Sequence, residues 1–280
     1  MITADAHNHS HLSVSLRDCL EHASETKVEL SLVNSCGPAD WAVLRDFAKC
    51  SRNCEVVPFF GIHPWHTGQG DSWRRELELL HETIKNALKQ SLKCGIGETG
   101  IHNTGNRKHS PGNLSRNNSG TVQNLDIQTE VFRFHVQLSA RYNLPMSIHC
   151  VRGWEILLRE LTEIRAARFM IHGFRGSWNI MQRVLRLNGW LSFGKDLVDK
   201  RESIRNAASD ALTAAPRERV LIESDWESGE NGSYSDLFTA VLSRSAELRG
   251  MTLNDAAELN LVNCRTFTES GEASHVRKNY

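Results

Sequence analysis

The chain has 280 residues, a length that is ordinary for a single barrel of alternating strands and helices and ample to bury a large core. Its 33 basic and 33 acidic residues give a formal charge of zero, so no overall basic field indicates nucleic-acid binding. Seven cysteines without a C-x-x-C pair are not typical of a disulfide framework, and they favour free thiols in a reducing compartment.

The N-terminal region lacks a basic segment followed by an apolar run, and no apolar stretch is long enough to span a bilayer. We therefore expect a soluble protein without a membrane partner, located in the cytoplasm or, alternatively, in the nucleus. The composition gives no indication of the oligomeric state.

Short apolar runs alternate with longer amphipathic stretches, which is typical of a βα-repeating fold with a parallel sheet. Eight runs predict strands, over residues 2–9, 28–35, 55–63, 93–98, 145–149, 168–172, 190–194 and 219–225. Helices are expected over residues 15–26, 38–51, 72–91, 127–142, 153–165, 177–187 and 234–249. An ill-defined helix follows Asp199, and residues 253–269 predict closing helices. This order predicts a TIM (β/α)₈ barrel.

One segment interrupts the alternation. Residues 103–124 are rich in Asn, Ser, Gly and basic side chains, and the pattern resumes unchanged after them. We interpret this segment as a flexible loop insertion, since a linker between domains would be followed by a new pattern. The sequence thus predicts one domain over residues 1–270 and a polar C-terminal tail over residues 271–280.

The first predicted strand carries an unusual polar pattern. Asp5, His7 and His9 alternate with small residues, so their side chains would line one face of the strand. Two neutral imidazoles this close are a good pair of ligands for a divalent metal, and Asp5 could orient one of them through a ring N–H. The alternative is a solvated terminal run of histidines that also includes His11.

Further residues able to bind a metal stand at or just past the ends of later strands: His63, Glu98, His149, His172 and Asp225. In a closed barrel these ends meet at one mouth, where barrel enzymes place their chemistry. Taken singly, Glu98 could be a solvated turn carboxylate, and His149 or His172 a core histidine. Taken together, four imidazoles and two carboxylates suffice for two ions that share one carboxylate.

Two ions sharing a carboxylate suit the hydrolysis of a phosphate ester. Glu98 is the expected bridge, because the glycines around it allow the backbone to bend. Asp225 could bind a metal and accept the proton of the attacking water. The donor set accepts Zn, Mn, Co and, less readily, Mg, so the identity of the ions stays open.

Seven ordered motifs cover nearly the whole chain: Asp5-Ala-His7-Asn-His9, Gly61-Ile-His63-Pro64-Trp-His66, Gly95-Ile-Gly97-Glu98-Thr-Gly100, Leu144-Pro145-Met-Ser-Ile-His149-Cys-Val-Arg152, His172-Gly-Phe174-Arg-Gly176-Ser177, Leu191-Ser-Phe-Gly194 and Glu223-Ser-Asp225. In order and approximate spacing they resemble the TatD family of metal-dependent hydrolases. This resemblance implies a TIM barrel of the amidohydrolase superfamily with deoxyribonuclease activity. It also implies that His7, His9, Glu98 and Asp225 hold one ion, and that Glu98, His149 and His172 hold the other.

The chain departs from the family pattern at several positions, which predicts remodelled loops over the mouth. His11 and His102 each stand where the family usually has Asp. Arg175 replaces the first Ser of a His-x-Phe-Ser-Gly-Ser motif, and Trp226 follows Asp225 in place of a small residue. None of these changes removes an implied metal ligand, so the sequence indicates a divergent branch.

Other residues near strand ends are candidates for binding substrate. Arg152 could grip a substrate phosphate, or else pair with Glu155 at the start of a helix. His63 is expected to contact substrate or to support a ligand. Lys195 is interpreted as a surface or phosphate-facing lysine. The tryptophans that follow strand ends could stack on a nucleobase, although packing of the loops is their commoner use; they are Trp65, Trp154, Trp178 and Trp226.

The sequence therefore predicts a two-metal hydrolase that cleaves phosphodiester bonds of DNA, as a deoxyribonuclease resembling a 3′–5′ exonuclease. One alternative is a hydrolase of the same fold that acts on another ester, an amide or a phosphomonoester. A second is an interaction protein with a vestigial metal site, although such a protein has no need to keep six donors in register.

Overall fold

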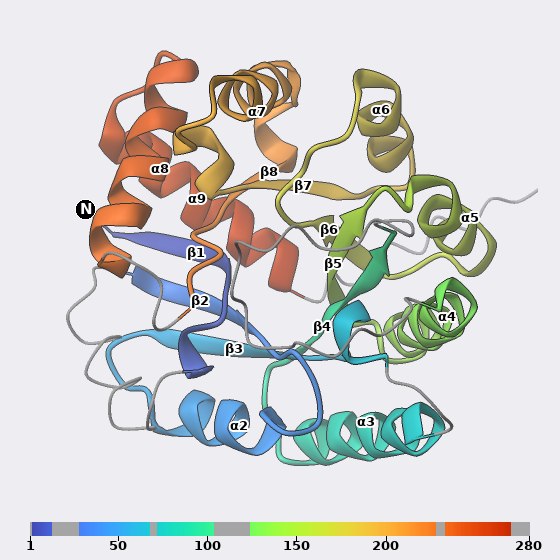
Figure 1. Cartoon of the computed structure of the whole chain (residues 1–280). Coiled ribbons are helices and arrows are strands. Elements are labelled where there is room, and N and C mark those ends of the chain that lie inside the picture. Colours follow the sequence, from blue (N-terminus) through green and yellow to red (C-terminus); the bar gives the residue numbers. More distant parts are fainter. Residues whose placement is uncertain (1, 13–27, 68–71, 104–123, 228–232, 270–280) are drawn as a thin grey trace, which may run out of the picture.

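The computed structural model describes residues 2–12, 28–67, 72–103, 124–227 and 233–269. Eight parallel strands form a single sheet in which each strand pairs with the next along the chain. The sheet curls into a nearly closed barrel with helices around it (Figure 1). The strands are β1 Thr3–Asn8, β2 Val28–Asn34, β3 Glu55–Phe60, β4 Gly95–His102, β5 Pro145–Val151, β6 Arg168–Ile171, β7 Trp190–Phe193 and β8 Val220–Ile222. The predicted TIM barrel is confirmed.

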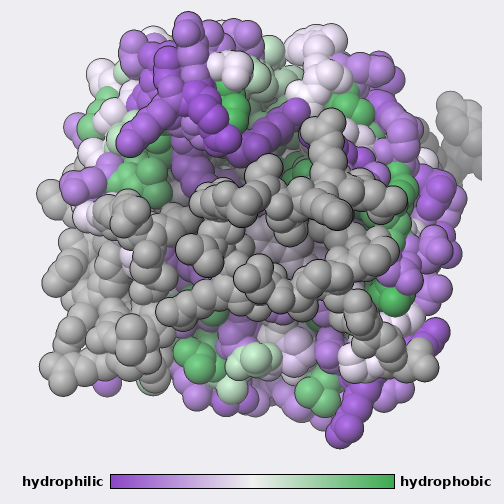
Figure 2. Space-filling model, viewed as in Figure 1, coloured by the Kyte–Doolittle hydropathy of each residue, from purple (hydrophilic) through white to green (hydrophobic). Residues whose placement is uncertain are grey.

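The helices alternate with the strands and present apolar faces to the sheet. They are α2 Trp41–Cys50, α3 Ser72–Lys89, α4 Leu125–Tyr142, α5 Trp154–Ile164, α6 Trp178–Arg186, α7 Glu202–Ala214, α8 Tyr234–Leu248 and α9 Leu253–Thr268. In α3, for example, the buried residues Trp73, Leu77, Leu80 and Ile84 recur at helical spacing. Polar residues dominate the described part of the face in Figure 2, and hydrophobic side chains form separate small groups there.

Polar caps fix where several helices begin. The Asn124 side chain accepts hydrogen bonds from the backbone of Asp126 and Ile127, and Ser177 and Thr252 cap α6 and α9 in the same way. Each cap satisfies backbone N–H groups that the first helical turn leaves without partners. These three helices therefore start at defined positions.

The seam between β1 and β8 is closed by the segment that follows β8. The backbone N–H of Asp225 donates to the His7 carbonyl at 2.9 Å, and the N–H of His9 donates to the Trp226 carbonyl at 2.8 Å. These bonds continue the parallel pairing beyond the end of β8. As a result, Asp225 is held directly beside the strand that carries the first two histidines.

The last helix, α9, closes the opposite end of the barrel. Its Leu261, Cys264 and Phe267 join a buried apolar cluster with residues of the barrel interior. The Phe267 ring lies 6.3 Å from that of Phe59 and 6.0 Å from that of Trp190, centroid to centroid. This end of the barrel is therefore filled with apolar side chains.

The predicted boundaries differ from the structure in a few informative places. Strand β4 runs to His102, four residues beyond the predicted end, so His102 lies on the sheet and not in a loop. The ill-defined helix after Asp199 is the regular helix α7, and the closing segment is one helix, α9. Strand β8 ends at Ile222, so Asp225 follows the strand in an irregular segment.

Some predictions fall on residues outside the described part of the chain. They are the helix over residues 15–26, nearly all of the insertion over residues 103–124, and the tail over residues 271–280. The single-domain assignment over residues 1–270 stays a prediction. Among the described residues, no helix combines the length and apolar character needed to cross a membrane.

Candidate active site

A buried carboxylate lies at the centre of the barrel mouth. Glu98, within β4, is only 3% exposed. A side chain at Gly97 would meet the Ser147 carbonyl at 2.8 Å, and one at Gly61 would meet the Gly97 backbone at 2.5 Å. Only glycine fits between these neighbouring backbones, so the two glycines allow β3, β4 and β5 to approach around the carboxylate.

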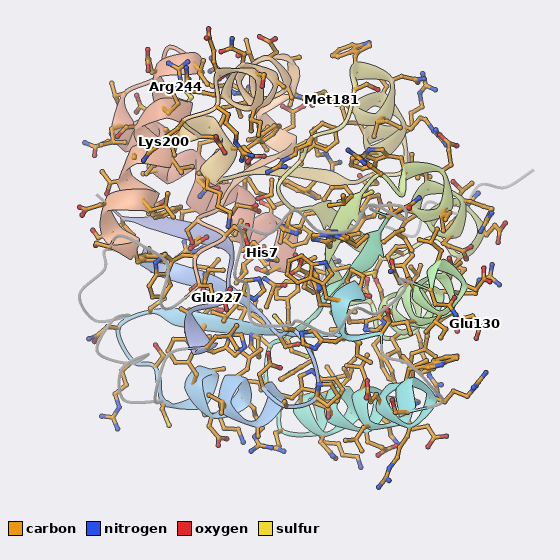
Figure 3. All side chains as sticks on the ribbon, in the orientation of Figure 1. His7, Glu130, Met181, Lys200, Glu227 and Arg244 are labelled. Atoms are coloured by element: carbon orange, nitrogen blue, oxygen red, sulfur yellow. The ribbon has the colours of Figure 1, made fainter. Side chains whose placement is uncertain are left out.

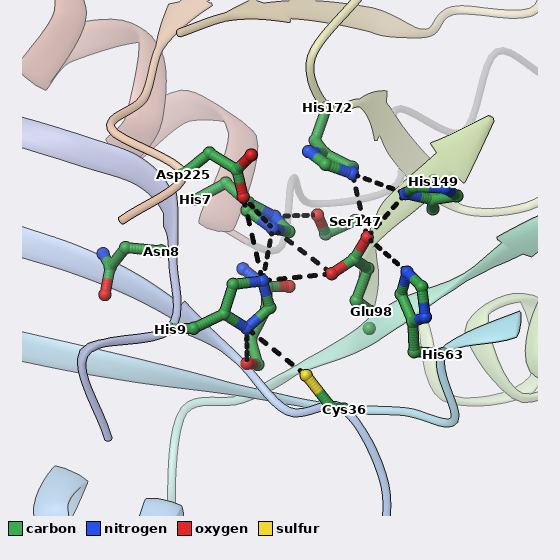
Figure 4. Close-up of polar contacts among 12 residues, drawn as sticks. His7, Asn8, His9, Cys36, His63, Glu98, Ser147, His149, His172 and Asp225 are labelled. Atoms are coloured by element: carbon green, nitrogen blue, oxygen red, sulfur yellow. Dashed lines mark hydrogen bonds and ion pairs between the residues drawn. The ribbon is translucent and has the colours of Figure 1, made fainter. Parts of the chain in front are cut away.

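One oxygen of Glu98 faces the histidines of the first strand (Figure 4). Glu98 Oε2 lies 3.1 Å from His9 Nε2 and 3.5 Å from His7 Nε2, and the two ring nitrogens are 3.2 Å apart. Asp225 Oδ1 completes this group at 3.8 Å from His7 Nε2 and 3.9 Å from His9 Nε2. Two imidazoles and two carboxylates thus converge on one point.

The other oxygen of Glu98 faces a second group of histidines. Glu98 Oε1 lies 2.8 Å from His172 Nε2, 2.9 Å from His149 Nδ1 and 3.3 Å from His63 Nε2. The nitrogens of His149 and His172 that face Glu98 are 3.1 Å apart. His63 therefore contacts Glu98 directly, as the predicted ligands His149 and His172 do.

Hydrogen bonds fix the orientation of the first two rings. His7 Nδ1 lies 2.8 Å from Ser147 Oγ, and His9 Nδ1 lies 2.7 Å from the Asn34 carbonyl. The carbonyl can only accept, so His9 donates to it from Nδ1 and presents Nε2 to Glu98. Such outer partners orient metal-binding histidines and select their tautomer.

The second pair of rings has different outer partners. His149 Nε2 lies 2.8 Å from His102 Nδ1, and the two rings stack at a centroid distance of 5.1 Å. His172 Nδ1 lies 3.5 Å from Glu223 Oε1, which also accepts from the Gly173 backbone at 2.8 Å. His102, which stands where the family usually has Asp, therefore contacts His149, one of the implied ligands. The prediction missed this contact because it ended the strand at Glu98.

Electrostatics hold Glu98 as a carboxylate. Burial by itself would raise its pKa, but the facing His63 and His172 and the hydrogen bonds from His149 and His172 hold the pKa well below its usual range. Burial lowers the pKa of His63 to about 4 although Glu98 opposes this. Glu98 is therefore charged, as a metal ligand must be, and the imidazole of His63 beside it is neutral.

Asp225 is positioned by its backbone and by Lys195. Its φ of +48° is in the left-handed region, which non-glycine residues seldom adopt, and the bond to the His7 carbonyl holds it there. Lys195 Nζ lies 3.0 Å from Asp225 Oδ2. Burial would raise the pKa of Asp225, but Lys195 and the histidines hold it below its usual range. Lys195, predicted as a surface or phosphate-facing lysine, is thus partly exposed and in contact with Asp225 at the mouth.

The donor chemistry fits divalent ions. Among the described residues, three overlapping groups each have donor atoms within 4.8 Å of one another: His7, His9 and Glu98; His7, His172 and Asp225; His63, Glu98 and His149. All are nitrogen or carboxylate-oxygen donors, which suits Zn, Mn or Co. Figure 3 shows that His7 lies in the middle of the barrel, whereas Glu130 and Arg244 belong to the outer ring of helices.

Asp5, in the first predicted strand, and His11, just beyond it, have partners that the sequence does not predict. Asp5 does not contact an imidazole ring: its carboxylate accepts from the backbone and hydroxyl of Ser224 at 2.9 and 2.6 Å and from Tyr234 at 2.8 Å. Asp5 therefore orients the backbone next to Asp225. His11, for which the sequence indicates no role, is buried, and its Nε2 lies 3.0 Å from Asp40 Oδ2.

The predicted substrate residues lie at the rim. Arg152 is exposed at the end of β5, with a φ of +52°. Its expected alternative partner Glu155 instead accepts from Arg183 at 2.5 Å, so the pairing of Arg152 with Glu155 is wrong. Of the tryptophans after strand ends, Trp226 is buried against Tyr234, whereas Trp65 is 54% exposed.

The chain is similar in sequence to known metal-dependent hydrolases. The family model described as TatD related DNase matches residues 4–269. The uncharacterized metal-dependent hydrolase YabD of Bacillus subtilis (strain 168) is 29% identical over 149 residues, which are 50% of this chain and 57% of that protein. The human protein named deoxyribonuclease TATDN3 is 23% identical over 199 residues, or 68% of each chain. The chain thus spans little more than half of the first of these relatives.

The fold is shared with solved structures. The TatD homologue YjjV of Escherichia coli K12 superposes with a TM-score of 0.75 at 20% identity, covering 95% of this chain and 97% of that one. A hydrolase of the TatD family from Entamoeba histolytica gives a TM-score of 0.68 at 14% identity and covers 95% and 99% of the two chains. From the match over residues 4–269, the chain belongs to the TatD-related DNase family of metal-dependent hydrolases.

Proposed function

We propose that this protein hydrolyses phosphodiester bonds of DNA at a centre of two divalent ions, acting from the 3′ end. The observation that carries the proposal is the placement of Glu98, one oxygen of which faces His7 and His9 while the other faces His149 and His172. A carboxylate with one oxygen in each of two histidine groups is suited to bridge two ions.

In this proposal the residues divide the work between the two sides of Glu98. His7, His9 and Asp225 would hold one ion, and His149 and His172 would hold the other. His63 would instead orient Glu98, because its Nδ1 accepts from the Trp65 backbone and its hydrogen is therefore on Nε2, 3.3 Å from Glu98 Oε1. Bound ions lower the pKa of a water and offset charge on the phosphate. Glu98 keeps the two donor groups at a fixed separation, because it is buried and contacts both.

Asp225 would accept the proton of the attacking water. A small cavity of about 30 Å³, enough for a water molecule, lies beside it and is lined by Lys195 and Glu223, among others. Lys195 keeps Asp225 ionised at neutral pH, as a metal ligand must be. The same contact weakens Asp225 as a base, so the proton would pass on to solvent through the cavity.

DNA is the preferred substrate class for two reasons. A relative that covers 68% of this chain is named a deoxyribonuclease, and the matching family is described as DNases. The rim also offers Arg152, whose guanidinium suits a phosphate. Neither argument depends on overall charge, which is zero.

A substrate panel tests the proposal. The chelated protein is reloaded with Zn, Mn, Co or Mg and offered single-stranded DNA, duplex DNA, RNA, p-nitrophenyl phosphate and simple esters. DNA cleavage that shortens a 5′-labelled strand one nucleotide at a time supports the proposal. Turnover of esters or phosphomonoesters alone would contradict it and favour another hydrolase activity, and complete inactivity with every metal would favour a vestigial site.

A further inference from the structure

A large apolar side chain is exposed beside the metal-capable cluster. Trp65 follows β3 and is 54% exposed, although tryptophan is usually mostly buried. Two other tryptophans after strand ends pack against aromatic neighbours, Trp226 on Tyr234 and Trp154 on Phe174. Loop packing therefore explains Trp226 and Trp154 but neither Trp65 nor Trp178, which is 61% exposed, and of these two Trp65 is the one whose ring contacts the site histidines.

The backbone of Trp65 is firmly held. It lies in a short 3₁₀ helix, Pro64–His66, and proline at the first position restricts the chain there. The backbone N–H of Trp65 donates to His63 Nδ1 at 3.1 Å, and the Thr67 hydroxyl donates to the Pro64 carbonyl at 2.7 Å. Because the backbone is already fixed, the Trp65 side chain loses little conformational entropy when a ligand binds.

The indole contacts the site through its histidines. Its centroid is 4.9 Å from that of His63, 5.4 Å from that of His102 and 6.5 Å from that of His149, with interplanar angles of 75°, 70° and 64°. His63 and His149 both touch Glu98. The exposed indole thus stands one side chain away from the carboxylate that faces both histidine groups.

We propose that Trp65 is the stacking platform for the nucleobase that flanks the scissile phosphate. The inference rests on the proposed function and adds a determinant of substrate specificity to it. Every nucleobase has a π face, so a base stacked on tryptophan gains affinity with little dependence on sequence. His102, which stands where the family usually has Asp, contacts both Trp65 and His149 and so ties the platform to the metal-capable cluster.

A binding experiment separates the contribution of the nucleobases to affinity from that of the sugar-phosphate backbone of the DNA. The probes are a fluorescent thymidine tetramer with phosphorothioate linkages and the same backbone carrying abasic units, so both have equal charge. Fluorescence anisotropy with the metal-loaded protein should show that the wild type binds the tetramer with bases more tightly, by roughly 5- to 150-fold for one stacked base. Trp65→Ala should bind the two probes equally, and Trp65→Phe should retain most of the preference.

Trp178→Ala is the matched control. Trp178 is 61% exposed, but it begins α6 and has no ring contact with the site histidines in the described part of the chain. This variant should discriminate between the probes as the wild type does. The inference is overturned if the wild type binds both probes equally or neither, if Trp65→Ala still prefers bases, or if Trp65→Ala weakens both probes to the same extent.

Kinetics distinguish this inference from the proposed function. With thymidine 5′-(p-nitrophenyl) phosphate, Trp65→Ala should raise KM about tenfold or more with little change in kcat. With methyl p-nitrophenyl phosphate, which has no base, both constants should stay unchanged. A wild type that discriminates between the tetramers yet cleaves neither ester would refute phosphodiester hydrolysis and leave the platform standing.

Discussion

The two ends of the barrel are built from the same eight strands but are closed in opposite ways. At the α9 end, Leu261 and Phe267 fill the interior with apolar surface. At the mouth, the strand ends carry polar groups, of which Glu98, His7, His9 and His63 are buried. The difference teaches that the α9 end supplies stability, because it buries apolar area, while the mouth holds groups whose burial costs free energy unless something binds them.

The largest effect should come from the mouth. Glu98→Ala removes the carboxylate whose two oxygens face the two histidine groups, so hydrolysis should fall by about ten-thousandfold, roughly 5 kcal/mol in transition-state stabilisation. Steady-state rates at saturating metal measure this. Glu160→Gln is the control, because Glu160 is equally buried but is held by Arg133 on the outer helices. Substantial activity in Glu98→Ala would contradict the two-metal assignment.

A substitution at the α9 end should lower the stability of the fold without changing metal binding or hydrolysis. Phe267→Ala leaves a cavity between α9, Phe59 and Trp190. Urea denaturation should therefore show a free energy of unfolding that is lower by about 3–5 kcal/mol than that of the wild type. Val262→Ala, an exposed position on the same helix, should change stability by less than about 0.5 kcal/mol. If Phe267→Ala changed metal affinity in the folded protein, the two ends would not be independent.

Helix α4, which packs against the outside of the barrel, contains a buried histidine that predicts a pH effect. His135 Nε2 accepts from the Ile62 backbone at 3.1 Å, and burial lowers its pKa from 6.5 to about 4. Between these values the unfolded state binds a proton that the folded state does not. The stability that His135 contributes is therefore present above pH 6.5 and lost as the pH falls to about 4, by up to about 3 kcal/mol.

His135→Gln should remove this dependence, since glutamine can keep an acceptor for Ile62 and cannot be protonated in this range. Urea unfolding of both proteins at pH 7 and near pH 4.5 gives the comparison. The variant should gain relative stability at the lower pH. Parallel pH profiles would show that His135 is not the titrating group.

The smallest effect concerns the outer partners of the histidines. Ser147→Ala removes the hydrogen bond to His7 Nδ1 and should weaken metal binding by about 10- to 100-fold with little loss of stability. Competition with a chelator measures the affinity. Ser209→Ala, at a buried serine on α7, is the matched control. Equal affinities in the two variants would show that Ser147 does not support a ligand.

The fold could be predicted because each layer of the barrel has its own sequence period. Runs such as residues 145–149 and 168–172 have the length and composition of buried strands, and α3 has the spacing of an amphipathic helix. The end of β4 could not be predicted. Glycine and polar residues beyond Glu98 look like a turn, yet pairing with β5 keeps them in the sheet as far as His102.

The convergence of the metal-capable residues could also be predicted, because parallel strands end at one mouth. Their partners could not. Ser147 and Asn34 are ordinary strand residues until the barrel closes and brings them against His7 and His9. The pairing of Lys195 with Asp225 joins residues 30 positions apart, and only the seam beside β8 brings them together. The roles of the site residues as ligands stay predictions.

Metal stoichiometry tests the central claim most directly. The protein is stripped with chelator, reloaded with Zn or Mn, freed of excess metal and analysed by mass spectrometry alongside its hydrolytic rate. The account predicts two ions per wild-type chain, with activity that appears only as the second ion binds, and at most one ion in Glu98→Ala. Full activity with a single ion, or with none, would contradict it.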